Sequence, residues 1–301
     1  MVGLLLLTLR ELRARKVVVG LFVVATLVWV VLAFALQLDV VDGSLAGARL
    51  FGQDAGASET LVLDGDGRPV IDPVTGEPMT EAAPPAFGGS LLESLVFGAQ
   101  TFVAGAAYWI GILLALFATG GLVASLVERG QVDVLLTKPL SRSKVLAGRL
   151  AGVWVVMLAL TVYLFGAVWL VMSIKSGIWN PRFLLAIGAV FGMFAVLYGV
   201  VALVGVWSGS APLSLIATLA LLFVTLVLAI PNLADQVSRV WRPLVVGLYA
   251  VLPKFGSVGT SLVPQLATGQ PVASLTPLLS SLAFGAVCYA GAFALFSRKD
   301  Y

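Results

Sequence analysis

The chain contains no histidine and a single cysteine, Cys288. Without histidine, neither an HExxH-type zinc site nor a serine or cysteine triad with a histidine base can form. One cysteine gives no disulfide framework, and the methionines are scattered rather than clustered as soft metal ligands. These absences exclude much hydrolytic and metal-dependent chemistry, so we expect no catalytic residue and no metal site.

Lysine is also scarce, and none of the six lysines follows a glycine. The Gly-Lys pair of a Walker A loop, which places backbone N–H groups and a lysine around phosphate, is therefore missing. Any ATP that drives this protein must be bound by another chain. We expect the protein not to be an enzyme and to hold no cofactor of its own.

Charged residues make up only 11% of the chain, against 60% hydrophobic residues and a mean hydropathy of +1.05. This apolar share lies far above that of a soluble domain and indicates an integral membrane protein. The net charge is +3 and the pI is near 9.1, but the basic residues sit at the ends of apolar runs. There they act as topology signals, so we expect a lipid membrane and no nucleic acid as partner.

Long uncharged runs predict six membrane-spanning helices, each close to the roughly 20 residues that cross a bilayer. Their expected ranges are 17–36, 101–125, 150–174, 183–206, 213–230 and 275–296. The break between the fourth and fifth is expected at WSGSAP, residues 207–212, because the uncharged run 183–234 is too long for one span. The predicted fold class is an all-α integral membrane protein with one transmembrane domain over residues 1–301.

Two further helices are expected beside the spans. Residues 2–16 combine leucines with four bases, a pattern typical of a helix that lies in the membrane interface. Residues 244–253 are apolar but only ten long, between Arg242 and Lys254. They are too short to cross, so they predict a re-entrant or interfacial segment before the last span.

Residues 37–93 hold ten acidic and two basic side chains. This segment is therefore expected as an extracytoplasmic insertion between the first two spans. Within it, TLVLDGDGRPVIDPVTG at 60–76 predicts a small hairpin, because two β-prone runs flank Asp-Gly turn signals. The basic N-terminal segment and the closing FSRKDY place both termini in the cytoplasm by the same charge rule.

A basic island, ERGQVDVLLTKPLSRSKVLAGRLAG at 128–152, lies between the second and third spans and carries five bases against two acids. Such a loop is expected in the cytoplasm. Val132, Leu135 and Leu136 recur at helical spacing, which predicts a short amphipathic helix that Pro139 ends. Ser141 then lies where the next helix would be capped.

The order and spacing of the island's residues resemble the permease subunits of ABC-2 type exporters. The matching positions are Glu128, Gly130, Leu135 with Leu136, Pro139, Ser141 with Arg142, and Gly148 with Arg149. The resemblance implies a coupling helix that docks on a separate ABC ATP-binding subunit, which binds ATP and Mg. The implied interface residues are Glu128, Arg129, Gly130, Val132, Leu135, Leu136, Pro139 and Arg142.

The same resemblance implies a single permease domain over the whole chain, paired with a second permease copy or a related permease in a bacterial or archaeal inner membrane. A shorter likeness lies at YAVLPKFGSV, residues 249–258, which is similar to permeases assigned to multi-copper enzyme maturation. Because metal ligands are few, an apolar or amphipathic cargo such as a lipid or a peptide suits the uncharged spans better than a metal.

A secondary transporter or channel that uses no ATP is the alternative. Ion-coupled carriers usually place ionisable side chains within the membrane, and none of the six expected spans contains Asp, Glu, Lys or Arg. This favours a pathway powered from outside the bilayer. Half-helix sites built from backbone groups can still bind ions, so the alternative stays open.

Overall fold

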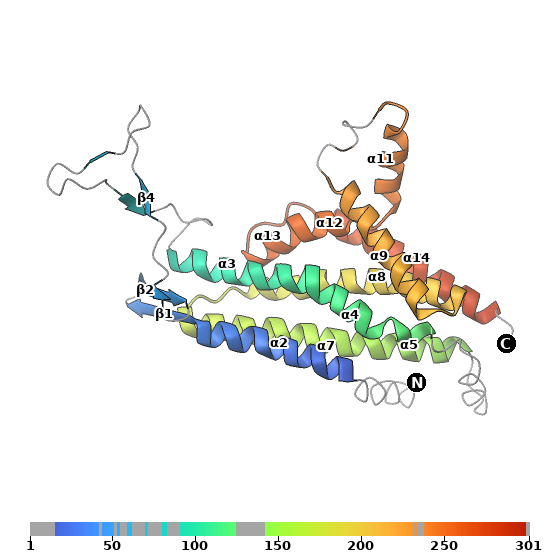
Figure 1. Ribbon diagram of the computed structural model, residues 1–301, viewed down its shortest axis with the longest axis horizontal. Helices are drawn as coiled ribbons and strands as arrows, with labels where there is room; N and C mark the ends of the chain where they lie inside the picture. The colour runs from blue at the N-terminus through green and yellow to red at the C-terminus, as the bar shows by residue number, and fades with distance from the viewer. Residues whose placement is uncertain are drawn as a thin grey trace.

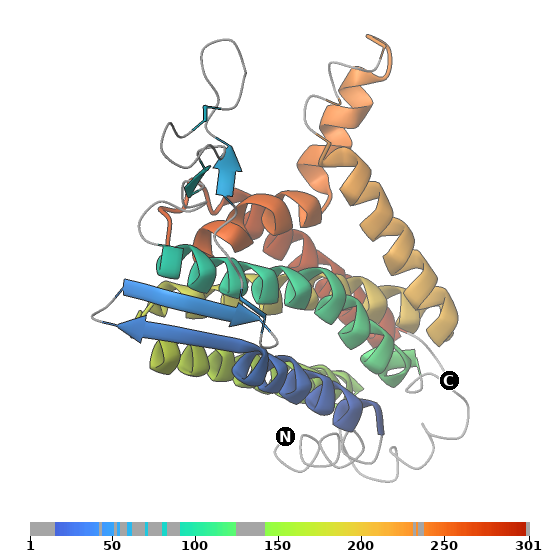
Figure 2. The ribbon, with the colours of Figure 1, turned by 60° about the vertical axis from the view of Figure 1, so that its left-hand side comes forward.

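The protein is described by a computed structural model, a bundle of long helices that lie side by side in two views (Figures 1 and 2). The described residues are 16–41, 44–50, 53–54, 59–61, 70–71, 80–82, 91–124, 142–230, 233 and 238–298. Five helical stretches within them are long and apolar enough to cross a membrane: Leu92–Val123, Ser143–Ser176, Pro181–Ser208, Ala211–Leu228 and Thr276–Arg298. The predicted multi-pass helical protein is confirmed at this level.

The stretch Leu92–Val123 is built from four consecutive helical segments. They are α3 (Leu91–Ala106), η1 (Ala107–Gly111, a π-helical turn), α4 (Ile112–Thr119) and α5 (Gly121–Ala124). The predicted start at residue 101 was wrong, since the helix begins ten residues earlier. Glu93 lies in the first turn of α3, where the positive end of the helix dipole favours an acid, so this charge does not end the helix.

The next span, α7 (Arg142–Ser176), also begins before its predicted start at residue 150. Arg149, directly before the predicted start at residue 150, is only 8% exposed, so it lies inside the packed part of the helix. After α7 the chain turns through η2 (Pro181–Leu185) into α8 (Ala186–Ser208). A prediction from uncharged residues alone therefore placed the starts of both helices, α3 and α7, too late, because each helix begins among polar or charged residues.

The break between α8 and α9 (Ala211–Leu228) falls inside WSGSAP, as predicted. Gly209 takes the left-handed conformation with φ of +66°, which closes α8 as C-terminal glycines commonly do. The hydroxyl of Ser210 then accepts a hydrogen bond from the Leu213 N–H at 3.5 Å and caps α9. Both signals are local, and the sequence therefore locates this turn to within a few residues.

One end of the bundle is formed by the ends of four helices. The shorter apolar helix α2 (Lys16–Ala35) lies parallel to α7, because Thr26 and Trp29 both bond to the Tyr163 hydroxyl while Lys175 donates to the Ala33 carbonyl. The starts of α2 and α7 therefore lie at the same end of the bundle as the ends of α5 and of α14 (Thr276–Arg298) (Figure 1). The segment 125–141 joins α5 to α7 at this end.

A bent pair of helices precedes α14. Its first arm is α11 (Arg242–Val251), and its second arm consists of α12 (Phe255–Ser257), η3 (Val258–Leu262, π-helical) and α13 (Val263–Ala267). The arms meet at 67°, as a broken span or a re-entrant loop does. The predicted segment 244–253 corresponds to α11, and the second arm was not predicted. Counting the pair as one span gives six crossings instead of five.

Short strands lie between α2 and α3. Three of them, β1 (Leu36–Val41), β2 (Ser44–Leu50) and β3 (Gln53–Asp54), form one antiparallel sheet, and β4 (Glu59–Leu61) pairs with β5 (Thr80–Ala82). The hairpin predicted within 60–76 was wrong in its pairing, because β5 lies beyond that segment. Turn signals indicate where a chain can reverse, but they do not determine which distant run becomes the partner.

Candidate functional site

Most of the predicted interface with an ATP-binding subunit lies outside the described residues. This holds for Glu128, Arg129, Gly130, Val132, Leu135, Leu136 and Pro139. Arg142 is the first residue of α7. The interfacial helix predicted at 2–16 also lies outside them, except that Lys16 begins α2. The structure describes the two spans on either side of residues 128–139, Leu92–Val123 and Ser143–Ser176.

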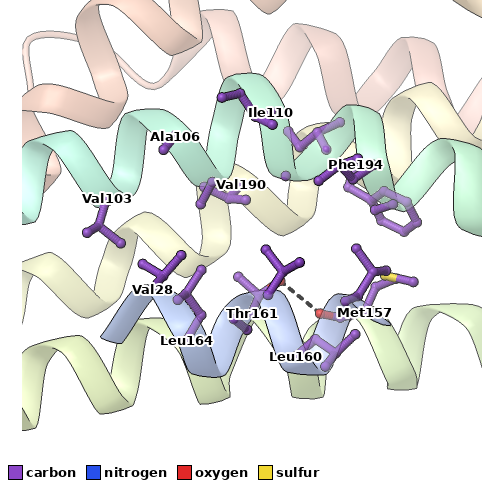
Figure 3. A pocket seen from close by; sticks show the side chains of 18 residues that line it. Val28, Val103, Ala106, Ile110, Met157, Leu160, Thr161, Leu164, Val190 and Phe194 are labelled. Atoms are coloured by element: carbon purple, nitrogen blue, oxygen red, sulfur yellow. Dashed lines mark hydrogen bonds between the residues drawn. The ribbon is translucent and has the colours of Figure 1, made fainter. Parts of the chain in front are cut away.

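Halfway along these spans, four helical elements enclose a cavity of about 320 Å³. Helices α2 and α7 form one wall, η1 with the adjoining parts of α3 and α4 forms the opposite wall, and α8 closes the back (Figure 3). Val103 lies opposite Val28 and Leu164 across it, while Val190 and Phe194 come from α8 (Figure 3). The cavity thus lies between the two spans that the island connects.

The lining of the cavity is apolar. Among the described residues, Thr161 supplies its one side-chain hydroxyl, and this donates to the Met157 carbonyl of the same helix at 2.8 Å (Figure 3). No acidic or basic side chain of the described part lines it. A charged ligand would lose its hydration without gaining a partner, which is costly, whereas a hydrocarbon group would exchange one apolar environment for another.

The cavity opens sideways between α2 and the η1–α4 wall. Val24, Ile110 and Leu114 line it and are 46%, 60% and 41% exposed, while Ile112 on the same wall is 2% exposed. Val24 lies near the middle of α2, and Ile110 near the middle of Leu92–Val123. The mouth is therefore far from the helix ends that would meet water.

The other face of η1 is packed against the bent pair. The Tyr108 hydroxyl donates to the Phe255 carbonyl at 2.6 Å, and the two rings stack with centroids 4.5 Å apart. A Cβ added to Gly259 would lie 2.5 Å from the Tyr108 ring and 2.7 Å from Trp109. Two π-helical turns, η1 and η3, thus meet at a contact that only glycine allows.

A buried amide holds the far end of the same arm. Asn180, 6% exposed, donates to Gln100 Oε1 at 2.9 Å and to the Ala267 carbonyl at 2.8 Å. These bonds tie the end of α13 to α3 and to the turn before η2. The bent pair is therefore fixed to the bundle at both ends of its second arm, by Phe255 with Gly259 and by Ala267.

One feature of the sequence points to this region. Between Glu93 and Glu128 lie 34 uncharged residues, more than one straight span requires. Part of this surplus lies in α3, which begins at Leu91, and the span is π-helical over Ala107–Gly111. The cavity itself could not be found in this way, because its lining comes from α2, α3–η1–α4, α7 and α8, which are far apart in the chain.

Within the described part of the chain, no group of three or more Cys, Asp or Glu side chains could hold a metal ion. The predicted absence of metal and cofactor stays a prediction, since this finding covers only those residues. Comparison with protein-family models, curated proteins and solved structures finds no match to the chain. Its function must be argued from its own residues.

Proposed function

We propose that this chain is the transmembrane subunit of an ABC-2 type ABC exporter, which forms the substrate pathway and is driven by a separate ATP-binding subunit. One observation carries the proposal. The segment 125–141, which holds the first part of the island, joins the stretches Leu92–Val123 and Ser143–Ser176, and the middles of both stretches line the cavity. Because packed helices move as rigid elements, a displacement at the island would change the cavity walls.

The island would dock on the ATP-binding subunit through a short amphipathic helix. Glu128 and Arg129 offer charge-assisted contacts, and Val132, Leu135 and Leu136 fill an apolar groove. The docking helix covers residues 128–139 and is ended by Pro139, while Gly130 and Arg142 belong to the interface that the resemblance implies. The partner subunit binds ATP and Mg, and this chain supplies the moving walls.

The bent pair before α14 supports the proposal as well, because the resemblance implies such an element there. The proposed orientation places both termini and the island in the cytoplasm and residues 37–93 outside. The shared end formed by α2, α5, α7 and α14 suits this orientation (Figure 1). We further propose a second permease copy, or a related permease, as partner in a bacterial or archaeal inner membrane.

One observation favours the alternative of a secondary transporter or channel. Lys254 lies at the bend of the helix pair, partly buried, and its ammonium group donates to the Ser280 hydroxyl at 3.2 Å. A basic side chain among membrane helices is a functional candidate by default. Under the alternative, Lys254→Met would abolish transport. Under the exporter proposal, it disturbs only the packing of the bend.

Co-purification from the native membrane tests the proposal. The tagged chain should carry an ATP-binding subunit, and Leu135→Asp should lose it, because an unpaired charge in an apolar groove removes a buried anchor. Arg142→Glu, beyond Pro139, should weaken the complex less than Leu135→Asp, since an exposed charge pair contributes only about 0 to 1 kcal/mol. Glu128→Ala should keep the complex but couple ATP hydrolysis poorly to transport.

Two results would contradict the proposal. The first is a Leu135→Asp variant that retains the partner and its transport-stimulated ATP turnover at the wild-type level. The second is saturable nucleotide binding by the isolated chain, which lacks a Walker A lysine.

A further inference from the structure

We propose that the cavity between α2, η1, α7 and α8 binds an acyl chain of a membrane lipid, which enters sideways between α2 and η1. This inference goes beyond the exporter proposal and does not depend on it, because it concerns the isolated chain in a bilayer. It rests on where the mouth lies, on what lines the cavity and on how much space the cavity holds.

The position of the cavity's mouth indicates which molecule can enter it. Val24 and Ile110 stand at its rim near the middles of their helices, and the hydrocarbon core of a bilayer extends about 15 Å to either side of that depth. Along α4, the exposed Leu114 at the rim continues into Phe117, which is 57% exposed. The lining is thus continuous with the surface that contacts lipid, so what reaches the mouth is an acyl chain.

The lining excludes water as a stable occupant. A buried water needs about two to four polar partners, and the Thr161 hydroxyl, which already donates to Met157, is the one side-chain polar group among the described lining residues. The volume of about 320 Å³ is roughly twice that of an apolar cavity of about 150 Å³ that stays dry and binds benzene. It therefore accommodates a length of acyl chain rather than a small solute.

An occupied cavity would also gain dispersion contacts that an empty one lacks. Atoms that face a void have no partner on one side, and here these atoms belong to Val28, Leu164 and Phe194 (Figure 3). A larger side chain at position 111 would fill part of the cavity. Gly111 lines the cavity, and a Cβ added there would find its nearest neighbours at 3.9 Å, on its own helix.

Photolabelling of the isolated chain tests this site. The chain is placed in phosphatidylcholine nanodiscs that contain a phosphatidylcholine with a diazirine midway along one acyl chain. After irradiation, mass spectrometry should find label on Val28 or Leu164 that saturates as the probe fraction rises. Label on the outward-facing Phe102, which is 73% exposed, should rise without saturating, because it reports lipid around the protein.

A graded series at Gly111 provides the decisive variants. Gly111→Ala, Gly111→Leu and Gly111→Phe should reduce cavity label progressively, and Phe by about tenfold or more. The control is Gly105→Phe in the same span, since a Cβ at Gly105 meets nothing within 4 Å and Gly105 does not line the cavity. Cavity label in the control should stay at the wild-type level.

Three outcomes would overturn the proposal. One is label confined to outward-facing residues, and another is saturable cavity label that Gly111→Leu and Gly111→Phe leave unchanged. The third is efficient disulfide formation between two copies of the chain by Ile110→Cys in a Cys288→Ser background. That result would place a second copy of the chain at the mouth in place of lipid. If Gly111→Phe fails to fold, the smaller Gly111→Leu decides.

Discussion

The two faces of η1 differ in how they are packed. On the side of the bent pair, a Cβ at Gly259 would come within 2.5 Å of the Tyr108 ring. On the cavity side, a Cβ at Gly111 would have nothing nearer than 3.9 Å. The same π-helical turn is therefore held rigidly from one side and left open on the other. A glycine against aromatic rings maintains the fold, whereas a glycine beside a cavity leaves room for a ligand.

This difference indicates which wall of the cavity can move. The η1 wall is held by Phe255 and Gly259, so it moves together with the bent pair. The opposite wall consists of α2 and α7, which are joined to each other through Tyr163. We expect a change of cavity shape to arise from a shift of α2 and α7 as a pair relative to η1.

The largest loss of stability is expected when the packed face is forced apart. Gly259→Leu would press a branched side chain against Tyr108 and Trp109, and overpacking of this kind costs about 3 kcal/mol at the upper end of its usual range. The free energy of unfolding can be measured by titration with sodium dodecyl sulfate in mixed micelles. Gly105→Leu, in open space, should change it by less than about 0.5 kcal/mol. Equal effects of the two variants would show that the contact is not tight.

A smaller loss is expected at the other end of the same arm. Asn180→Ala would leave Gln100 Oε1 and the Ala267 carbonyl without their donor, and an unsatisfied buried acceptor costs about 2 kcal/mol. The same titration measures it. Ser261→Ala is the control, because that hydroxyl is exposed and bonds only within its own turn. A loss at Asn180 no larger than at Ser261 would exclude the amide as an anchor.

Removal of the Tyr108 hydroxyl tests the contribution of its hydrogen bond to stability apart from that of the ring stacking. Tyr108→Phe keeps the stacking on Phe255 but loses the 2.6 Å bond to its carbonyl, for an expected cost of about 1 kcal/mol. Tyr249→Phe loses an exposed hydroxyl contact to Ser257 and should be nearly neutral. A neutral Tyr108→Phe would mean that the rings alone hold the contact.

The smallest effect is expected on the open face. In Gly111→Leu the new side chain enters the cavity and displaces no atoms of the protein. The free energy of unfolding should therefore change by less than about 0.5 kcal/mol. The comparison with Gly259→Leu is direct, because both variants place leucine in a π-helical turn. If Gly111→Leu destabilises as strongly as Gly259→Leu, the cavity face is packed after all.

Local chemistry made part of this fold predictable. The turn within WSGSAP was located because the uncharged run 183–234 is too long for one span, and in the structure a left-handed Gly209 and a capping Ser210 form it. Five of the six predicted apolar runs correspond to helices long and apolar enough to cross a membrane, and the first, 17–36, corresponds to the shorter helix α2. The start of α3 was missed because a helix N-terminus tolerates Glu93, and the start of α7 because a helix can continue through charged residues up to Arg142.

The site was harder to predict because it depends on contacts between distant segments. The π-helical turn at 107–111 forms where Gly259, about 150 residues later, makes room for Tyr108 and Trp109. The pairing of β4 with β5 likewise joins segments that are not adjacent in the chain. The island was recognisable from the order of Glu128, Leu135 and Pro139, and its contacts with a partner stay a prediction.

The central claim is that nucleotide at the island end changes the cavity. Double electron–electron resonance tests it on the complex with the proposed ATP-binding subunit in nanodiscs, with spin labels at Val24→Cys and Ile110→Cys in a Cys288→Ser background. The account predicts that ATP shifts the distance distribution across the mouth, while a control pair at Phe102→Cys and Ser261→Cys, across the packed face, stays unchanged. Superimposable distributions for the mouth pair with and without ATP would contradict it.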